Sequence, residues 1–149
     1  MIKNLSHAGI YVLDYESAKE FYTAKLGFEV RQDVKMDGRF RWLTVGLAGQ
    51  PGLQFTLMEP GPPQHDPETE KQLRKLIAKG VLGMGVFETE DCRGTFEVLS
   101  ARGVNFLQEP ADRPYGVECV FRDDSGNWFS LTERREFDPG QEWGLCVDG

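Results

Sequence analysis

A histidine close to the start of the chain is the side chain best suited to chemistry. In residues 5–12, strand-like alternation puts His7, Gly9 and Tyr11 on one face. An imidazole at this place could contact a ligand, act as a general base or bind a metal ion. It could equally be a strand histidine whose nitrogens are satisfied inside a polar cavity. Both interpretations of His7 remain open.

By strand alternation, residues on several other predicted strands face the same side of the sheet as His7. Their mixture of polar and apolar side chains favours a pocket for a neutral or aromatic small molecule over a dry core. Tyr11 and Trp128 could stack on a flat ligand, although ordinary packing against helices would also explain either ring. No residue is assigned a catalytic role. The predicted ligand-binding residues are His7, Tyr11, Gln54, Thr56, Met84, Trp128 and Ser130.

Two further positions bear on the charge of a ligand. Arg41 is the candidate cation for an anionic ligand if its side chain faces the pocket. Alternation along a strand forbids Arg41 and Trp42 both facing inward, and the sequence leaves the choice open. His65 follows a proline-rich segment and precedes Asp66, so we expect it to be a solvated loop residue.

The elements that must position these residues follow the order βαβββ twice. In each half an aspartate, Asp14 or Asp91, is suited to cap the start of a helix, and a glycine, Gly27 or Gly103, to end it. Turn-forming residues 124–127 predict a tight hairpin before the last strand. The predicted strands are 5–12, 28–35, 40–47 and 53–58 in the first half, and 82–88, 104–108, 116–121 and 128–133 in the second.

The two halves are related by a nearly constant shift, which indicates an internal duplication. From Asp14 to Asp91 the shift is 77 positions, and from Gly27 to Gly103 it is 76. The same shift matches four candidate residues in two pairs, His7 with Met84 and Gln54 with Ser130.

A breaker-rich segment separates the halves. Three prolines and a glycine in residues 59–63 do not suit a helix or a central strand, and Asp66 and Pro67 then suit the start of a connecting helix that ends at Gly80. The C-terminal tail, which contains Phe137, Trp143 and Leu145, either clips onto the surface or a partner subunit or is partly mobile. The predicted organisation is a first module at 4–58, a linker with its helix at 59–80, a second module at 81–133 and a tail at 134–149.

Composition excludes several classes of function. With 149 residues, 40% of them hydrophobic and 28% charged, the chain has the balance of a soluble globular protein, and none of its apolar runs approaches the roughly 18 residues of a membrane span. Residues 1–6 lack the apolar region of a secretory signal, which predicts a cytoplasmic protein. A net charge of −7 argues against nucleic acid as a partner. The three cysteines, Cys92, Cys119 and Cys146, follow no metal or redox spacing.

Four short pieces of sequence carry a resemblance to a known family. They are residues 6–12 with Asp14, Phe21-Tyr22 before residues 26–28, residues 85–88 before Asp91, and residues 123–127. In this order, within a duplicated frame covering about residues 4–133, they resemble the vicinal oxygen chelate superfamily, which includes glyoxalase I, bleomycin-resistance proteins, fosfomycin-resistance enzymes and extradiol dioxygenases. The resemblance implies an α+β fold in which two βαβββ modules form a glyoxalase-like half-barrel cup. It implies no single reaction, because one fold carries many chemistries.

The resemblance also implies where a divalent metal would sit. In the metalloenzymes of the superfamily the ligands come from the first and last strands of each module, and those positions hold His7, Gln54, Met84 and Ser130 here. A thioether and a neutral hydroxyl are poor ligands for zinc, nickel, iron or manganese, and a catalytic zinc site commonly needs three protein ligands. We therefore expect no metal and no other cofactor, and these four positions are interpreted as vestigial.

Three hypotheses for function follow. The first is a glyoxalase/bleomycin resistance-like protein that binds a small organic molecule in the cup without a metal. The alternative is a divalent-metal-dependent lyase or dioxygenase of the same superfamily. A second alternative is a protein-interaction module whose cup is filled by its own side chains. Modules often pair in resembling proteins and two-fold dimers are the commonest oligomers, so we also expect a homodimer.

Overall fold

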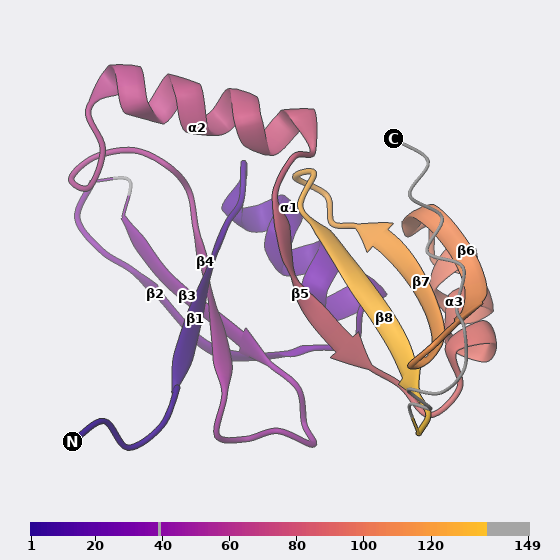
Figure 1. The fold of residues 1–149 in the computed structure, drawn as a ribbon. Coiled ribbons are helices and arrows are strands. Elements are labelled where there is room, and N and C mark those ends of the chain that lie inside the picture. Colours follow the sequence, from indigo (N-terminus) through magenta and orange to yellow (C-terminus); the bar gives the residue numbers. More distant parts are fainter. Residues whose placement is uncertain (39, 137–149) are drawn as a thin grey trace. The chain divides into compact units, whose positions relative to one another are not determined.

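Two four-stranded sheets carry the fold of residues 1–38 and 40–136, the part of the chain that this computed structural model describes (Figure 1). By their internal contacts the residues divide into two compact units. Among the described residues, the first contains Met1–Met84 and Arg122–Trp128, and the second contains Gly85–Phe121 and residues 129–136. The C-terminal residues Phe137, Trp143, Leu145 and Cys146 lie outside the described residues.

The first sheet has the strand order β1-β4-β3-β2. Strand β1 is parallel to β4, while β4 with β3 and β3 with β2 are antiparallel. The parallel pair requires a crossover, and the helical segments between β1 and β2 begin it. The strands are β1 (His7–Tyr11), β2 (Glu29–Lys35), β3 (Arg41–Gly46) and β4 (Gln54–Met58).

The helical segment after β1 forms as its caps predict. The carboxylate of Asp14 accepts a hydrogen bond from the Ser17 amide at 2.8 Å, which satisfies a free amide at the start of α1 (Tyr15–Glu20). A π-helical segment, η1 (Phe21–Lys25), continues it, and Gly27 follows with a left-handed φ of 79°. The apolar side of these helices covers one face of the first sheet, with Ile10, Val12, Ala18, Phe21, Tyr22, Phe28, Leu43, Val45 and Leu57 buried.

The connecting helix α2 (Pro67–Lys79) belongs to the first unit. Asp66 caps it through the Thr69 amide, Pro67 occupies the first turn, and Gly80 ends it with a φ of 80°. Ile77 is its buried anchor.

The turn at Arg122–Trp128 also lies in the first unit, although it connects two strands of the second sheet. Oδ1 of Asp123 accepts three backbone hydrogen bonds, from Ser125, Gly126 and Asn127, each at 2.9 Å. The turn is bound to the end of β1, because Asn127 donates to the Tyr11 carbonyl at 2.8 Å and Ser125 accepts from the Leu13 amide at 2.9 Å. Its motif therefore has a structural role.

The second sheet has the strand order β5-β8-β7-β6. Strand β6 is longer than the sequence predicted, because it continues to Arg113 instead of ending at Gln108. It includes Pro110, which cannot donate a sheet hydrogen bond and is tolerated because β6 is an edge strand. The elements are β5 (Gly83–Glu88), α3 (Cys92–Ala101), β6 (Asn105–Arg113), β7 (Gly116–Arg122) and β8 (Trp128–Arg134).

The core of the second unit is aromatic. The Phe87 ring stacks on Phe121 and Phe129, with centroids 6.2 and 4.8 Å away, and the Phe106 ring packs edge-on against Phe96. These residues close the face of the sheet opposite to Ser130 and Thr132, as alternation requires.

The fold class predicted from the sequence is confirmed: each half is a βαβββ-like module with a four-stranded sheet, and the described strands do not form a closed barrel. Among these residues no helix is long and apolar enough to cross a bilayer.

Candidate ligand-binding site

His7 and Gln54 lie opposite each other in the first sheet, in register across the parallel pair of β1 and β4. The His7 ring is 5.7 Å from the ring of Trp42 on β3. Its Nδ1 is 3.0 Å from the Ser6 hydroxyl. Its Nε2 is buried and has no hydrogen-bond partner among the described residues. The face that carries His7 therefore combines an unsatisfied polar atom with an aromatic ring.

Strand β3 settles which of two neighbouring residues shares the His7 face. Trp42 does, and its indole nitrogen donates to Gln32 at 2.8 Å. Arg41 lies on the helix-covered face, where it is 8% exposed and bound to Asp33 at 2.7 and 2.8 Å and to Glu16. The hydrogen bonds from Arg41 and Lys19 hold the pKa of the Asp33 carboxyl well below its ordinary value. Arg41 is thus committed to its ion pairs and does not face a ligand beside His7.

Polar side chains continue along β4 and β3. The Thr44 hydroxyl donates to Oε1 of Gln54 at 2.8 Å, so the amide NH₂ of Gln54 is left to donate to other groups. Thr56 is paired with Gly9 on one side and Thr44 on the other, and it is buried. The central residues of this face include no carboxylate, ammonium or guanidinium group. The face comprises His7, Tyr11, Trp42, Thr44, Gln54, Thr56 and Met58 and is called the His7 face below.

Tyr11, at the end of β1, contacts a residue that the sequence placed in solvent. His65 is half-buried, and its Nε2 is 3.2 Å from the Tyr11 hydroxyl. Its Nδ1 accepts a hydrogen bond from the Gly61 amide at 3.1 Å. The expectation of a solvated loop histidine is wrong, because the proline-rich linker folds back onto β1 and carries His65 with it.

A small pocket of about 50 Å³ opens beside this contact. Backbone and side chains of residues 59–62 form one wall. The other lining groups are mainly aromatic or apolar and include Tyr11, Tyr15, Phe40, Met58, His65 and Arg74. We call it the linker pocket. Since Tyr11 and Met58 belong to both, it continues the His7 face at the ends of β1 and β4.

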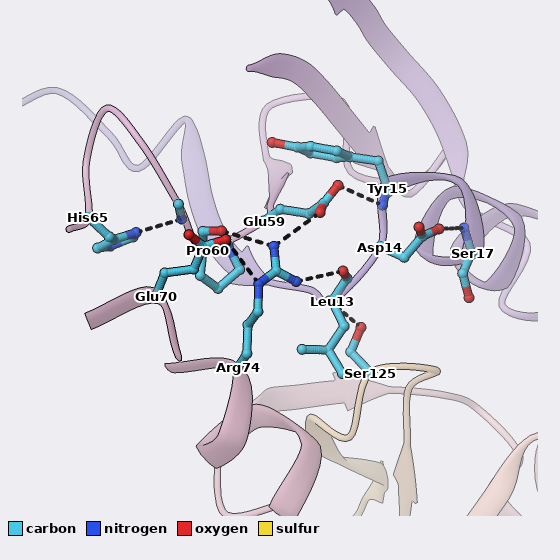
Figure 2. A network of polar contacts seen from close by, with 11 residues as sticks. Leu13, Asp14, Tyr15, Ser17, Glu59, Pro60, His65, Glu70, Arg74 and Ser125 are labelled. Atoms are coloured by element: carbon cyan, nitrogen blue, oxygen red, sulfur yellow. Dashed lines mark hydrogen bonds and ion pairs between the residues drawn. The ribbon is translucent and has the colours of Figure 1, made fainter. Parts of the chain in front are cut away.

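Arg74 of α2 holds the wall of the linker pocket in place, as Figure 2 shows. Its guanidinium donates to the carbonyls of Leu13 and Pro60, each at 3.0 Å, and contacts the carboxylates of Glu59 and Glu70, each at 3.3 Å. Glu59 also accepts from the Tyr15 amide at 3.3 Å. Two carboxylates neutralise one guanidinium, so Arg74 is a structural clamp and offers no unpaired charge to an anion.

The predicted ligand-binding residues of the second half lie on strands β5 and β8. Trp128 is 37% exposed, and its ring lies so close to Gly83 that a Cβ there would overlap it. Met84 is half-buried in β5. Ser130 lies in the second unit, where its hydroxyl donates to Glu118 at 2.5 Å and is 3.1 Å from the Thr132 hydroxyl.

Glu118 is a polar residue that sequence reasoning missed. Its carboxylate accepts from Ser130 and, at 2.8 Å, from the Tyr115 hydroxyl, and Arg113 lies 3.8 Å away. The signal was present in the predicted strand 116–121, because Glu118 is flanked by Val117 and Cys119, which are buried in the core.

The backbone hydrogen bonds match the last strands of the two halves differently from the constant sequence shift of 76 or 77 positions. The backbone N–H of Gln54 donates to the Ser6 carbonyl, and the backbone N–H of Trp128 donates in the same way to the Leu82 carbonyl. By this register Gln54 corresponds to Trp128, a shift of 74 from position 54 to position 128. Strand β8 is thus offset by two residues, which keeps the same face because strand periodicity is two.

The donor set does not fit a catalytic metal. The oxygen of Gln54 accepts from Thr44, and Ser130 donates its proton to Glu118, so neither presents a good ligand atom. In the described part of the chain no three His, Cys, Asp or Glu side chains are grouped so that they could hold an ion.

Comparisons with known proteins agree with the geometry. Residues 4–131 match the family model of the Glyoxalase/Bleomycin resistance protein/Dioxygenase superfamily. The chain is 33% identical over 133 residues to the protein YetH of Bacillus subtilis (strain 168), covering 89% of this chain and 100% of that one.

Two solved structures are similar over most of their length. UcmS2 is 56% identical, with a TM-score of 0.85, and the match covers 89% of this chain and 99% of that one. TnmS3, an antibiotic binding protein from Streptomyces sp. CB03234, is 25% identical with a TM-score of 0.70, over 90% of this chain and 98% of that one. The chain belongs to the Glyoxalase/Bleomycin resistance protein/Dioxygenase superfamily.

Proposed function

We propose that this chain binds a flat, neutral small organic molecule on the His7 face, without a metal. The observation that carries the proposal is Nε2 of His7, a buried polar atom that lacks a partner among the described residues and lies beside the Trp42 ring. An unsatisfied buried polar group costs about 1–3 kcal/mol, and a ligand hydrogen bond would remove that penalty. The ring next to it can stack on an aromatic ligand at the same time.

The charges around this face support a neutral ligand. Apart from the imidazole, the seven side chains of the His7 face include no carboxylate, ammonium or guanidinium group. Three arginines contact this sheet or the linker beside it, Arg31, Arg41 and Arg74, and each has a carboxylate within 3.6 Å. A carboxylate or phosphate would therefore lose hydration without gaining a partner.

The similarity to TnmS3 suggests the class of ligand. Because that relative is an antibiotic binding protein, we infer that the ligand of this chain is an antibiotic or a similar planar metabolite, held without being transformed. The predicted residues Trp128, Met84 and Ser130 are part of this proposal. So are the homodimer and the cytoplasmic location expected from the sequence.

A binding screen tests the proposal. Purified protein is heated with planar aromatic antibiotics and with non-planar ones as controls, since a ligand of the native state raises the unfolding temperature. Calorimetry of each hit is then repeated with His7→Phe, which keeps a ring and removes both nitrogens. It is also repeated with Trp42→Ala, for which Trp42→Phe is the conservative control. We expect His7→Phe to weaken binding about fivefold, corresponding to one hydrogen bond. Binding that is unaffected by His7→Phe and by Trp42→Ala would place the ligand elsewhere.

Metal analysis tests the rest of the proposal. Protein purified without a metal-affinity tag should contain no stoichiometric transition metal, because the donor set is too poor to compete with water and buffer. One tightly held ion per chain that is lost in His7→Ala would contradict this and favour the lyase or dioxygenase alternative. Light scattering measures the oligomeric state, and a mass of 16.9 kDa at every concentration would exclude the homodimer.

A further inference from the structure

We propose that the linker pocket is a subsite for a neutral hydrogen-bond-accepting substituent of the ligand, such as a ketone oxygen. The Tyr11 hydroxyl donates to that oxygen, and His65 is the residue that positions the hydroxyl. The inference rests on the proposed function, because it concerns one end of the molecule that binds on the His7 face.

The direction of the hydrogen bonds determines what Tyr11 can offer. The Gly61 amide must donate to Nδ1 of His65, so that nitrogen carries a lone pair. In a neutral imidazole the proton is then on Nε2, which lies 3.2 Å from the Tyr11 oxygen. The Tyr11 oxygen therefore accepts from His65, and its own proton remains available. Among the described residues Tyr11 has no acceptor for that proton.

The electrostatics of the pocket select the charge of the group that binds there. The guanidinium of Arg74 is held by two backbone carbonyls and by the carboxylates of Glu59 and Glu70. The wall thus carries no net positive charge. An anionic oxygen would lie near carboxylates without an unpaired cation, whereas a neutral ketone needs only the one donor that Tyr11 provides.

The size of the pocket limits how much of a ligand it admits. A buried water needs about 10–15 Å³ of such space, so about 50 Å³ accommodates a carbonyl group with its neighbouring carbons but no complete drug-sized molecule. Tyr15, Phe40 and Met58 supply apolar walls around it. The substituent would enter the linker pocket while the ring that bears it stays on the His7 face.

Acetophenone is a suitable probe, because an acetyl group on a flat ring matches this division. Ethylbenzene lacks its acceptor and benzoate adds a charge, so the three form a matched set. Each is titrated into the full-length ¹⁵N-labelled protein, and amide shifts of Gly61 and His65 report the pocket while those of His7 and Trp42 report the His7 face. We expect acetophenone to shift both groups and to bind more tightly than either other probe.

Tyr11→Phe isolates the hydroxyl and keeps the ring. It should weaken acetophenone binding about threefold to tenfold, to the level of ethylbenzene, and leave ethylbenzene unchanged, as expected for one hydrogen bond. Equal loss for both probes would mean that Tyr11 acts through packing, and tighter binding of benzoate would mean that the pocket prefers anions. Either result overturns the inference.

The role of His65 has its own readout. A long-range ¹H–¹⁵N spectrum, assigned with His65→Asn, should show a neutral ring protonated at Nε2, and a ring protonated at Nδ1 would overturn the positioning role. If acetophenone shifts His7 and Trp42 but not Gly61, the subsite is wrong and the proposed function stands. If no probe shifts either group, both are wrong.

Discussion

The hydroxyl of Tyr22 donates a hydrogen bond to Oδ2 of Asp123 at 2.8 Å, and both side chains are buried. The two residues are far apart in sequence but lie in the same unit. Since Oδ1 of Asp123 holds the turn at Arg122–Trp128, this contact ties that turn to η1. Burial, and then the neighbouring Asp123 carboxylate, raise the pKa of Tyr22 well above its ordinary value.

Tyr22→Phe should therefore reduce the free energy of unfolding at pH 7. The variant keeps the ring and removes one hydrogen bond to a charged group, which typically contributes about 1.5–3 kcal/mol. Urea denaturation measures the change. Tyr115→Phe is the control, because it removes a hydroxyl bonded to the partly exposed Glu118. We expect it to reduce the free energy of unfolding by less than Tyr22→Phe does.

The same hydrogen bond predicts how the free energy of unfolding changes at high pH. A folded-state pKa raised above the unfolded value, about 10, means that the stabilisation is complete below pH 10 and is lost as pH rises toward the folded pKa. The unfolding free energy of the wild type should fall above pH 10, and that of Tyr22→Phe should fall less steeply. Parallel pH profiles would contradict the assignment.

Gly126→Ala should destabilise the first unit by about 2 kcal/mol or more. Gly126 has a φ of 121°, which non-glycine residues rarely adopt, and a Cβ there would overlap the carbonyl of Ile77 at the end of α2. Gly52→Ala is the matched control, because nothing lies within 4 Å of the added Cβ. Thermal unfolding of both variants tests this, and equal melting temperatures would show that the turn can move away from α2.

Asp33 should make stability sensitive to acid. Its pKa is lowered, first by the hydrogen bond from Arg41 and then by that from Lys19, so its contribution is complete above an unfolded pKa of about 4 and is lost as pH falls below it. Asp33→Asn should lower stability at pH 7 and show a shallower decline between pH 4 and pH 2. Chemical denaturation across this pH range measures the change. If the unfolding free energy of Asp33→Asn fell with pH as steeply as that of the wild type, Asp33 would not be a source of the acid sensitivity.

Trp128→Ala should weaken the binding of a ligand found in the screen by about 1–3 kcal/mol, the value expected for a buried aromatic contact. Ser130→Ala deletes only the hydroxyl and leaves no large void, so its cost in fold stability is limited to the hydrogen bond to Glu118, about 1–3 kcal/mol. Calorimetry compares Trp128→Ala with Trp128→Phe, which retains an aromatic ring. A ligand that binds all three proteins equally would exclude Trp128 from the site.

Local chemistry explains why so much of the fold was readable from the sequence. The caps at Asp14, Asp66 and Asp91 act on amides three residues away, and Gly27 and Gly80 adopt left-handed conformations at helix ends. Such interactions are complete within a few residues, so the sequence by itself determined where the helices begin and end. The repeat of the βαβββ order determined that there are two similar modules.

The candidate site depended on contacts between distant residues. Alternation allowed either Arg41 or Trp42 to share the His7 face, and only the ion pairs of Arg41 with Asp33 and Glu16 decided it. A shift of two residues in β8 leaves the alternation unchanged, so the correspondence of Gln54 with Trp128 required the strand hydrogen bonds. His65 became part of a pocket because Arg74 fastens the linker against the end of β1, and no local pattern encodes where a proline-rich segment will fold back.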